Sequence, residues 1–414
     1  MQTKLAPEFK GTADGAAAEA ILRKCVHCGF CNATCPTYQL LGDELDGPRG
    51  RIYLMKQVLE GAPVTRSTQQ HLDRCLTCRN CESTCPSGVQ YGSLVDIGRR
   101  IVEARVERPV AEKALRWLLK EGLTSALFSP AMKLGQMVRP LLPASLQNKV
   151  PAKAPAQAHR WPTRTHPRKV LMLMGCVQPA MMPNINSATA RVLDAAGIQT
   201  LVADDAGCCG AIRAHLGDHN GSLDDMRRNI DAWWPLVSGA ASEGRVEAIV
   251  MNASGCGVTV KDYGHALAAD AAYADKARRI SELTRDLSEL LPDLVPALHR
   301  KVKPGRVTQL AFHPPCTLQH GQQLRGGVET QLNALGFAVQ VAGEESHLCC
   351  GSAGTYSVLQ PKLAYALRDR KLANLAPLEP QVIVSANVGC IQHLQTGTTT
   401  PVKHWVEVLD DALI

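Results

Sequence analysis

Two cysteine runs of identical spacing constrain this chain more than any other feature of its sequence. The first run, CVHCGFCNATCP, covers residues 25–36, and the second, CLTCRNCESTCP, covers residues 75–86. Each run places three cysteines at successive three-residue steps, adds a fourth cysteine four residues later, and ends in proline. Thiols this close together indicate either disulfides or the ligands of a metal or cluster.

The N-terminal sequence favours ligands over disulfides. MQTKLAPEFKGTADGAAAEA has no basic segment followed by an apolar core, so we do not expect a secretory signal. We expect a cytoplasmic protein, in which reducing conditions leave the 16 cysteines for metal or redox use. We expect no transmembrane helix either, because no stretch of about 18 uninterrupted apolar residues occurs.

The spacing of the runs is that of the bacterial ferredoxin motif. In two-cluster proteins, three cysteines of one run wrap one [4Fe-4S] cluster, and the fourth ligates the cluster of the other run. The proline suits the first turn of a following helix. Zinc sites use two ligands per loop, so a third cysteine in each run disfavours zinc. We therefore predict two [4Fe-4S] clusters, the first held by Cys25, Cys28, Cys31 and Cys85 and the second by Cys75, Cys78, Cys81 and Cys35.

The formal net charge of +7 does not indicate nucleic-acid binding. A cluster with four thiolates carries a net charge of about −2, and two such clusters bring the balance close to neutral. Between the runs, residues 42–61 carry apolar side chains at helical spacing after Pro48. Arg49 and Arg51 either interact with a cluster or belong to the solvated start of this helix, and the sequence favours neither interpretation.

Residues 93–145 have the apolar spacing of amphipathic helices. Within them GLTSALFSPAMKLGQMVRPLLPASL is apolar but interrupted by prolines, so it either packs between domains or lies against a membrane surface or a quinone site. Domain packing is the commoner role for such a stretch. Residues 149–169 are rich in proline, alanine and basic residues, a linker composition that places the main domain boundary here.

After the linker, the chain repeats one pattern of strands, helices and cysteines. In the first copy single cysteines flank a pair, and the second copy has the same order. The first set is Cys176, Cys208, Cys209 and Cys256, and the second is Cys316, Cys349, Cys350 and Cys390. Alternating strands and helices predict a parallel α/β unit in each copy. The carboxyl ends of parallel strands are where ligands bind, so each set of four cysteines is a candidate site.

The occupant of these sites stays open at the sequence level. A third iron–sulfur cluster, a zinc ion and a redox-active set of thiols all suit the residues, and buried cysteines that merely pack are the structural alternative. His313, followed by two prolines and Cys316, is either a ligand or proton carrier or a structural residue.

The predicted fold is a multidomain α+β and α/β chain. A mainly helical, ferredoxin-type domain for two [4Fe-4S] clusters covers residues 1–110. A helical segment and the linker cover residues 111–168. Two tandem α/β cysteine-rich domains follow, at residues 169–305 and 306–414.

Three stretches give the chain a specific resemblance: ELDGPRGRIYLMKQVLEG, HLDRCLTCRNCESTCPSGVQYG and LVDIGRR. Together with the two CCG-type repeats, they resemble the iron–sulfur subunits of flavin-linked respiratory dehydrogenases, and most closely the iron–sulfur subunit of bacterial glycolate oxidase. The resemblance covers essentially the whole chain. One departure concerns the broader CCG family, which often closes each repeat with C-x-x-C, whereas here Cys256 and Cys390 are followed three residues later by Thr259 and His393.

The resemblance implies an electron-transfer subunit of a glycolate dehydrogenase, with D-lactate as a second substrate. An FAD-binding subunit would oxidise glycolate to glyoxylate, a second flavoprotein-like subunit would complete the complex, and this chain would pass electrons toward the quinone pool. Such a complex would lie in the cytoplasm or peripherally on the cytoplasmic face of the inner membrane. The sequence agrees with this division of labour, because it has no G-x-G-x-x-G and no P-loop, so we expect no flavin on this chain. The chain alone is not expected to oxidise the substrate.

Other functions share parts of this pattern. The iron–sulfur subunit of anaerobic glycerol-3-phosphate dehydrogenase has the same architecture, and the partner would distinguish it. A thiol-redox protein like heterodisulfide reductase is disfavoured by the missing fifth cysteine in each repeat. An iron–sulfur scaffold or sensor is distinguished by whether substrate-dependent dye reduction needs this chain.

Overall fold

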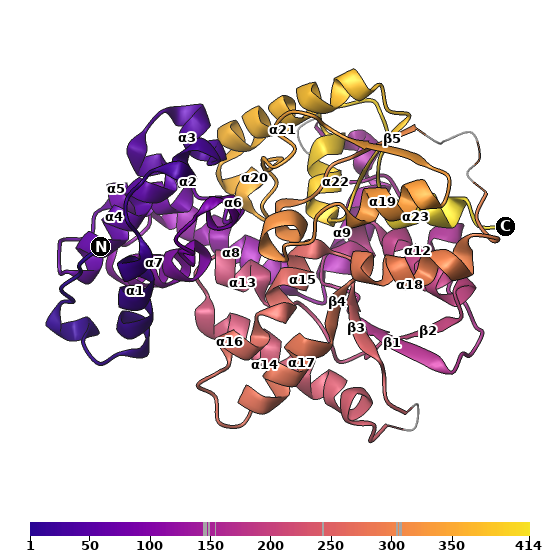
Figure 1. Ribbon diagram of the computed structural model, residues 1–414, viewed down its shortest axis with the longest axis horizontal. Coiled ribbons are helices and arrows are strands. Elements are labelled where there is room, and N and C mark those ends of the chain that lie inside the picture. The colour runs from indigo at the N-terminus through magenta and orange to yellow at the C-terminus, as the bar shows by residue number, and fades with distance from the viewer. Residues whose placement is uncertain (144–146, 148–149, 154, 242–243, 304, 306–308) are drawn as a thin grey trace.

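A computed structural model describes residues 1–143, 147, 150–153, 155–241, 244–303, 305 and 309–414. Figure 1 shows a helical lobe formed by the N-terminal part of the chain, beside a larger part that contains two sheets. Among the described residues, no helix is both long and apolar enough to cross a membrane.

The N-terminal lobe packs four longer helices around the two cysteine runs. They are α1 (Ala13–Lys24), α4 (Pro48–Leu59), α5 (Arg66–Asp73) and α7 (Tyr91–Arg105). Shorter elements lie between them: η1 (Pro7–Phe9), α2 (Phe30–Ala33), α3 (Pro36–Leu41), η2 (Glu44–Asp46) and α6 (Asn80–Thr84). Pro36 opens α3 directly after the first run, as its fixed φ favours. Helices α4 and α7 approach closely at Gly98, where an added Cβ would lie 2.5 Å from Sδ of Met55.

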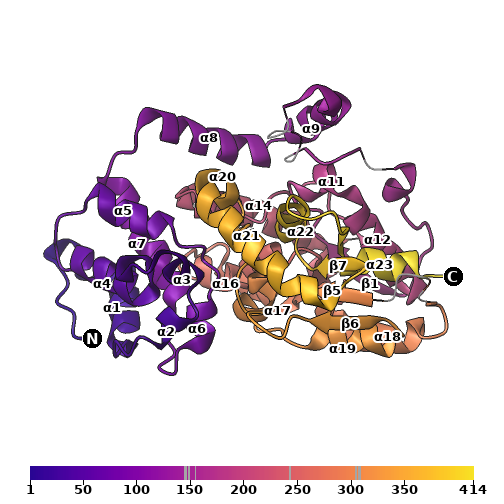
Figure 2. The same ribbon diagram turned by 90° about the horizontal axis from the view of Figure 1, so that it is seen from above.

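Helices α8 (Val110–Thr124) and α9 (Phe128–Met137) connect the lobe to the rest of the chain. They run along the outside of the molecule, as Figure 2 shows, and neither helix contains a fully buried residue. The 3-10 turns η3 (Arg139–Leu141) and η4 (Ala156–His159) follow. Residues 144–146 of the apolar stretch and residues 148, 149 and 154 near the linker lie outside the described residues.

Two parallel four-stranded sheets form the rest of the molecule. The first has the order β2-β1-β3-β4 and the second the order β6-β5-β7-β8. Their strands are β1 (Arg168–Met172), β2 (Ile198–Leu201), β3 (Ala248–Met251), β4 (Thr284–Asp286), β5 (Gln309–Phe312), β6 (Ala338–Val341), β7 (Val382–Ser385) and β8 (Val402–His404). Every strand pair in the register is parallel. The predicted fold class, a helical cluster domain followed by α/β repeats, is therefore confirmed.

Helices connect the strands of each sheet. In the first repeat they are α11 (Gln178–Met181), α12 (Pro183–Ala195), α13 (Ala211–His215), α14 (His219–Ser238), α15 (Ser254–Lys261), α16 (Tyr263–Ala266), α17 (Ala274–Leu283) and α18 (Leu287–Leu298). In the second repeat they are the π-helical turn η5 (Thr317–Gly321), α19 (Gly327–Ala334), α20 (Tyr356–Leu359), α21 (Pro361–Leu375), η6 (Ala376–Leu378), α22 (Val388–Gln395) and α23 (Trp405–Asp411).

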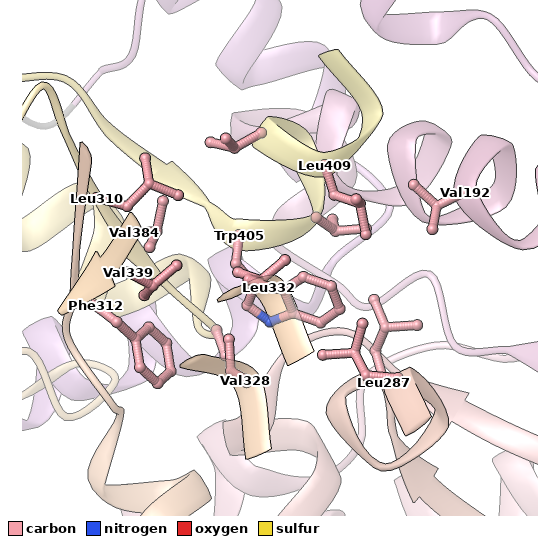
Figure 3. Packing of buried hydrophobic residues seen from close by; sticks show 14 of the residues in the cluster. Val192, Leu287, Leu310, Phe312, Val328, Leu332, Val339, Val384, Trp405 and Leu409 are labelled. Atoms are coloured by element: carbon pink, nitrogen blue, oxygen red, sulfur yellow. The ribbon is translucent and has the colours of Figure 1, made fainter. Parts of the chain in front are cut away.

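The two repeats share one hydrophobic core. Helix α12 of the first repeat packs against α23 of the second, and α18 of the first packs against α19 of the second. Figure 3 shows the indole of Trp405 among side chains from both repeats, including Leu287 and Leu332. The division expected at residues 305 and 306 thus separates two sheets that share a core.

Candidate metal centres

The two cysteine runs adopt the same local backbone conformation. Left-handed φ values occur at matching positions of both loops, 57° at His27 and 53° at Thr77, then 85° at Gly29 and 58° at Arg79. In each run the first three cysteines flank these residues, and the fourth immediately precedes a proline. The repeated spacing in the sequence therefore corresponds to a repeated loop conformation.

The folded loops bring together one group of four cysteines that draws on both runs. Burial raises the pKa of the Cys31 thiol to about 11, and the neighbouring Cys25, Cys28 and Cys85 raise it as well. Three of these residues belong to the first run and Cys85 to the second. Cys28 is the exposed member of the group.

A second group combines the other four cysteines. Burial raises the pKa of Cys81 well above its usual value, and the neighbouring Cys78, Cys75 and Cys35 contribute to this rise. Cys35, from the first run, is buried and lies 3.3 Å from Oγ1 of Thr37. Each group thus contains three thiols from one run and one from the other.

Arginine side chains surround the second group. Burial disfavours the Cys75 thiolate, but Arg51 and Arg99, the Thr77 N–H and the Tyr91 hydroxyl together lower its pKa. Arg99 donates hydrogen bonds to the Cys75 carbonyl oxygen at 2.7 Å and to Oγ1 of Thr77 at 2.9 Å. These groups favour the thiolate, which is the form that binds metal.

The two arginines of α4 have different environments. Arg51 is buried and donates through Nε to the His71 carbonyl oxygen at 2.7 Å and through Nη1 to Oγ1 of Thr37 at 3.1 Å. Arg49 instead pairs with Glu44, with Nε 2.6 Å from Oε1. Arg51 is thus a buried cation beside the second group, and Arg49 belongs to a half-exposed ion pair.

The cysteines of the first repeat gather at the carboxyl ends of its strands. Cys176 follows β1, the pair Cys208 and Cys209 follows β2, and Cys256 lies in the first turn of α15 after β3. Cys176 and Cys209 donate hydrogen bonds toward the Cys208 sulfur, and these bonds lower the pKa of Cys208. The Cys208 sulfur also accepts the Gly210 N–H at 3.4 Å.

The second repeat builds the corresponding group from the corresponding loops. The Sγ atoms of Cys316 and Cys349 are 3.7 Å apart. Single ligand atoms of His313, Cys350 and Cys390 all lie within 4.8 Å of one another. The structure therefore brings all four predicted cysteines of this repeat together and adds His313 to them.

A glycine in left-handed conformation follows each cysteine pair. The φ values are 93° at Gly210 and 90° at Gly351, and a Cβ at Gly351 would lie 2.4 Å from the Ala364 carbonyl oxygen. A side chain is excluded there by both conformation and space. The glycine of each CCG sequence therefore permits the turn that sets the orientation of the preceding cysteine pair.

The second repeat contacts the N-terminal lobe directly beside its buried cysteines. Cys78 of the lobe packs against Cys316 and Cys349. In addition to burial, Cys316 raises the pKa of the Cys78 thiol, and Cys78 contributes to the raised pKa of Cys349. Leu76 packs in one cluster with Cys316, Cys349 and Tyr356. The Tyr356 hydroxyl donates to the Arg74 carbonyl oxygen at 3.0 Å. The second group of the lobe and the cysteines of the second repeat therefore adjoin each other.

A cavity of about 980 Å³ lies between the lobe, both repeats and the connecting helices. Its lining includes the four cysteines of the first repeat and three of the second, together with Cys78 of the lobe. Its outer wall comes from α8 and α9, which contribute Leu119, Leu123, Phe128 and Met132. The cavity is mostly apolar, which is typical of a binding site for a small molecule.

The donor chemistry of the lobe fits iron–sulfur clusters. Each group of four offers thiols alone, and in the second group the Thr77 N–H and two arginines stabilise the Cys75 thiolate. Sequence reasoning missed Arg99 and Lys371, the latter 2% exposed and close to Cys350, Cys349 and Cys316. Both residues lie more than 20 positions along the chain from the cysteines that they approach. No local pattern in the sequence connects them to these cysteines, so only the fold reveals the contact.

Comparison with known proteins gives the same division of the chain. Residues 21–89 match the family model of the 4Fe-4S dicluster domain, and residues 170–261 and 310–395 each match that of the cysteine-rich domain. The glycolate oxidase iron-sulfur subunit of Escherichia coli (strain K12) is 53% identical over 414 residues, covering 100% of this chain and 99% of that protein.

More distant relatives cover the chain to different extents. The probable glycolate oxidase iron-sulfur subunit of Bacillus subtilis (strain 168) is 29% identical and covers 94% of this chain and 91% of its own length. Lactate utilization protein A of the same strain is 22% identical and covers 58% of this chain and 99% of its own length. With a dicluster domain, two cysteine-rich domains and this full-length similarity, the chain is an electron-transfer protein that belongs to the family of glycolate oxidase iron-sulfur subunits.

Proposed function

We propose that this chain carries electrons from a flavoprotein that oxidises glycolate to glyoxylate, and delivers them to a quinone. Oxidation of one glycolate releases two electrons and two protons, the flavin of the partner accepts them, and one quinone takes up two electrons and two protons to become the quinol. The observation that supports this role best is the series of adjoining thiol groups, which leads from an exposed cysteine to an apolar cavity.

We propose the two groups of the lobe as the ligand sets of the two clusters. The first set is Cys25, Cys28, Cys31 and Cys85, and the second is Cys75, Cys78, Cys81 and Cys35. When bound, the clusters supply one-electron carriers, which a chain without a flavin needs. Arg51 and Arg99 offset the negative charge of the second set and favour the thiolate form of its Cys75.

The partner flavoprotein is proposed to dock beside the first set. Cys28 is exposed, and the large side chains of Val26 and Phe30 on either side of it are exposed as well. Tyr53 of α4 is also exposed and lies edge-on to His27, with 6.3 Å between ring centroids. An exposed apolar group of this kind around a redox ligand is typical of an interaction surface.

The quinone is proposed to bind in the cavity. The cavity is apolar, and the cysteines of both repeats line it, so a quinone head group there would lie next to thiol ligands. Its outer wall is formed by the inward-facing side chains of α8 and α9. The opposite faces of these helices expose a second apolar set: Trp117, Leu118, Leu134 and Met137.

We propose that this outer face rests on the cytoplasmic surface of the inner membrane. A helix pair that exposes apolar side chains together with a lysine, Lys133, suits a peripheral contact with anionic lipid. A quinone in the lipid would then reach the cavity past α8 and α9. The sequence left membrane contact and domain packing open for this stretch, and the proposal assigns packing to the inner side chains of these helices and membrane contact to the outer ones.

D-lactate is the second substrate that we propose, because several relatives are named for lactate utilization. The second flavoprotein-like subunit is proposed on the family resemblance alone. Substrate choice would lie in the flavoprotein, since this chain contributes thiol groups and an apolar cavity.

The test is reconstitution of this chain with its flavoprotein, followed by quinone reduction. We expect glycolate-dependent quinone reduction only when both components are present. The double variant Trp117→Ser, Leu118→Ser should lose binding to vesicles of anionic phospholipid but retain flavoprotein binding. Phe30→Asp should show the reverse pattern, so each variant is the control for the other. Equal quinone reduction by the flavoprotein alone would contradict the proposed role.

A further inference from the structure

His313 is a buried histidine without a hydrogen-bond partner. It follows β5 directly, and its side chain is 1% exposed. Neither ring nitrogen has a partner among the described residues. An imidazole in its neutral form has one ring nitrogen that offers a lone pair to a metal. Leaving such polar atoms unpaired in a core is unfavourable, and a bound ligand would remove this cost.

The unpaired ring lies among the thiols of the second repeat. Its ligand atom and those of Cys350 and Cys390 lie within 4.8 Å of one another, a spread that ligands of one metal centre can have. Cys349 is the hydrogen-bond neighbour of Cys350 on one side, and its Sγ is 3.7 Å from Cys316 on the other. Four thiols and one imidazole therefore form one continuous group.

In the first repeat an apolar residue stands at the position that matches His313. The residue three positions before its leading cysteine is Leu173, in the place that His313 takes before Cys316. Leu173 is buried and offers no donor atom. The two repeats therefore differ in ligand chemistry although their cysteines match.

A second histidine of this repeat is committed to another contact. His393 follows Cys390 by three residues, where the broader family often has a cysteine. Its Nε2 lies 3.0 Å from the Ala364 carbonyl oxygen, and its ring stacks on Tyr365. The His393 ring is thus engaged away from the thiols, whereas His313 is not.

The two repeats also differ in the charge of the residue beside their cysteines. Lys371 is 2% exposed and lies close to Cys350, Cys349 and Cys316. In the first repeat the neutral Asn229 of α14 takes the corresponding place. The glycine after each cysteine pair faces a helix carbonyl, that of Ser222 in the first repeat and that of Ala364 in the second. Asn229 and Lys371 each lie seven positions after that carbonyl. A buried cation next to three of the four thiols fits thiolates that are gathered on a metal centre.

We propose that His313 is a nitrogen ligand of a third iron–sulfur centre, whose other ligands are Cys316, Cys349, Cys350 and Cys390. Five donors exceed the four that a structural zinc ion takes, and their extended arrangement suits a centre with several irons. Replacing a thiolate ligand by a neutral imidazole raises the reduction potential of such a centre. This centre therefore accepts electrons more readily than one held by cysteines alone, at the point where the second repeat adjoins the lobe.

The test is pulsed electron paramagnetic resonance on the full chain, purified without oxygen, reduced with dithionite and labelled with nitrogen-15 histidine. We expect a strongly coupled histidine nitrogen in the wild type. His313→Leu should lose this coupling, and His393→Leu, the matched buried control, should retain it. His313→Cys should keep the iron, lose the coupling and shift the potential of the centre downward, which separates loss of a ligand from misfolding.

Three results would overturn the inference. They are no strong histidine coupling in the wild type, a coupling that survives in His313→Leu, and an iron content that Cys350→Ser leaves unchanged. The inference needs iron–sulfur chemistry in this chain but no particular substrate. A missing histidine signal combined with intact glycolate-dependent quinone reduction would therefore reject the ligand and leave the proposed function standing.

Discussion

Arg51 should raise the reduction potential of the cluster that we assign to Cys75, Cys78, Cys81 and Cys35. Oγ1 of Thr37 lies 3.1 Å from Nη1 of Arg51 and 3.3 Å from Sγ of Cys35, so the guanidinium nitrogen and this sulfur are at most about 6.4 Å apart. At that distance and an effective dielectric constant of about 20, a unit charge contributes about 2–3 kcal/mol. For one electron this corresponds to about 100 mV.

The perturbation is Arg51→Met, which removes the charge and keeps much of the volume. The positive charge favours the more negative, reduced cluster, so we expect the midpoint potential to fall by about 100 mV. Asp46 keeps Arg74 as a partner, with Nη1 2.7 Å from Oδ2. Loss of a buried ion pair also destabilises the fold, by about 3–5 kcal/mol, so cluster content has to be measured alongside.

The assay is an anaerobic redox titration followed by electron paramagnetic resonance. Arg51→Lys retains the charge and should restore most of the potential. Arg108→Met is the matched control, because Arg108 is another buried arginine of the lobe and pairs with Asp73 and Glu103. An unchanged potential in Arg51→Met at full cluster content, or an equal fall in Arg108→Met, would refute the reasoning.

Three further predictions concern the ligands and the shared core. Cys35→Ser should perturb the cluster bound mainly by the second run, and a loss confined to the signal of the first-run cluster would contradict the crossed ligand sets. Trp405→Ala should destabilise the protein by about 3–5 kcal/mol, and in a chemical denaturation followed by probes in each sheet both repeats should unfold together, whereas separate transitions would argue against a shared core. Gly351→Ala should cost about 1–3 kcal/mol and reduce the iron held by the second repeat, while a variant with wild-type stability and iron would show that the left-handed turn is unimportant.

Local sequence patterns were enough to predict many of the strands and helices of this fold. Strands β1, β3, β5 and β7 coincide with the apolar runs KVLMLM, AIVMN, QLAF and VIVSA, and Pro48 begins α4 where the helical spacing starts. Parallel strands bring their carboxyl ends to one edge, so the cysteines behind them meet without any further signal. The candidate sites of both repeats could thus be predicted from spacing alone.

Long-range packing explains what the sequence did not reveal. Strands β4 and β8 have three residues each, too few for a period-two pattern to stand out. The sequence also left the roles of Arg49 and Arg51 open, and the fold divides them, burying Arg51 beside the second group and pairing Arg49 with Glu44. Lys371 lies on α21 and approaches Cys349 and Cys350 only in the folded chain. The cavity forms only where the lobe, both repeats and helices α8 and α9 meet.

The most direct test of the electron-transfer account is an anaerobic titration of the reconstituted complex with glycolate, followed by electron paramagnetic resonance. The account predicts that glycolate alone gives rise to the signals of reduced iron–sulfur clusters on this chain, and that added quinone returns them to the oxidised state. If the flavin became reduced while the clusters of this chain stayed oxidised, the chain would not lie on the path of the electrons.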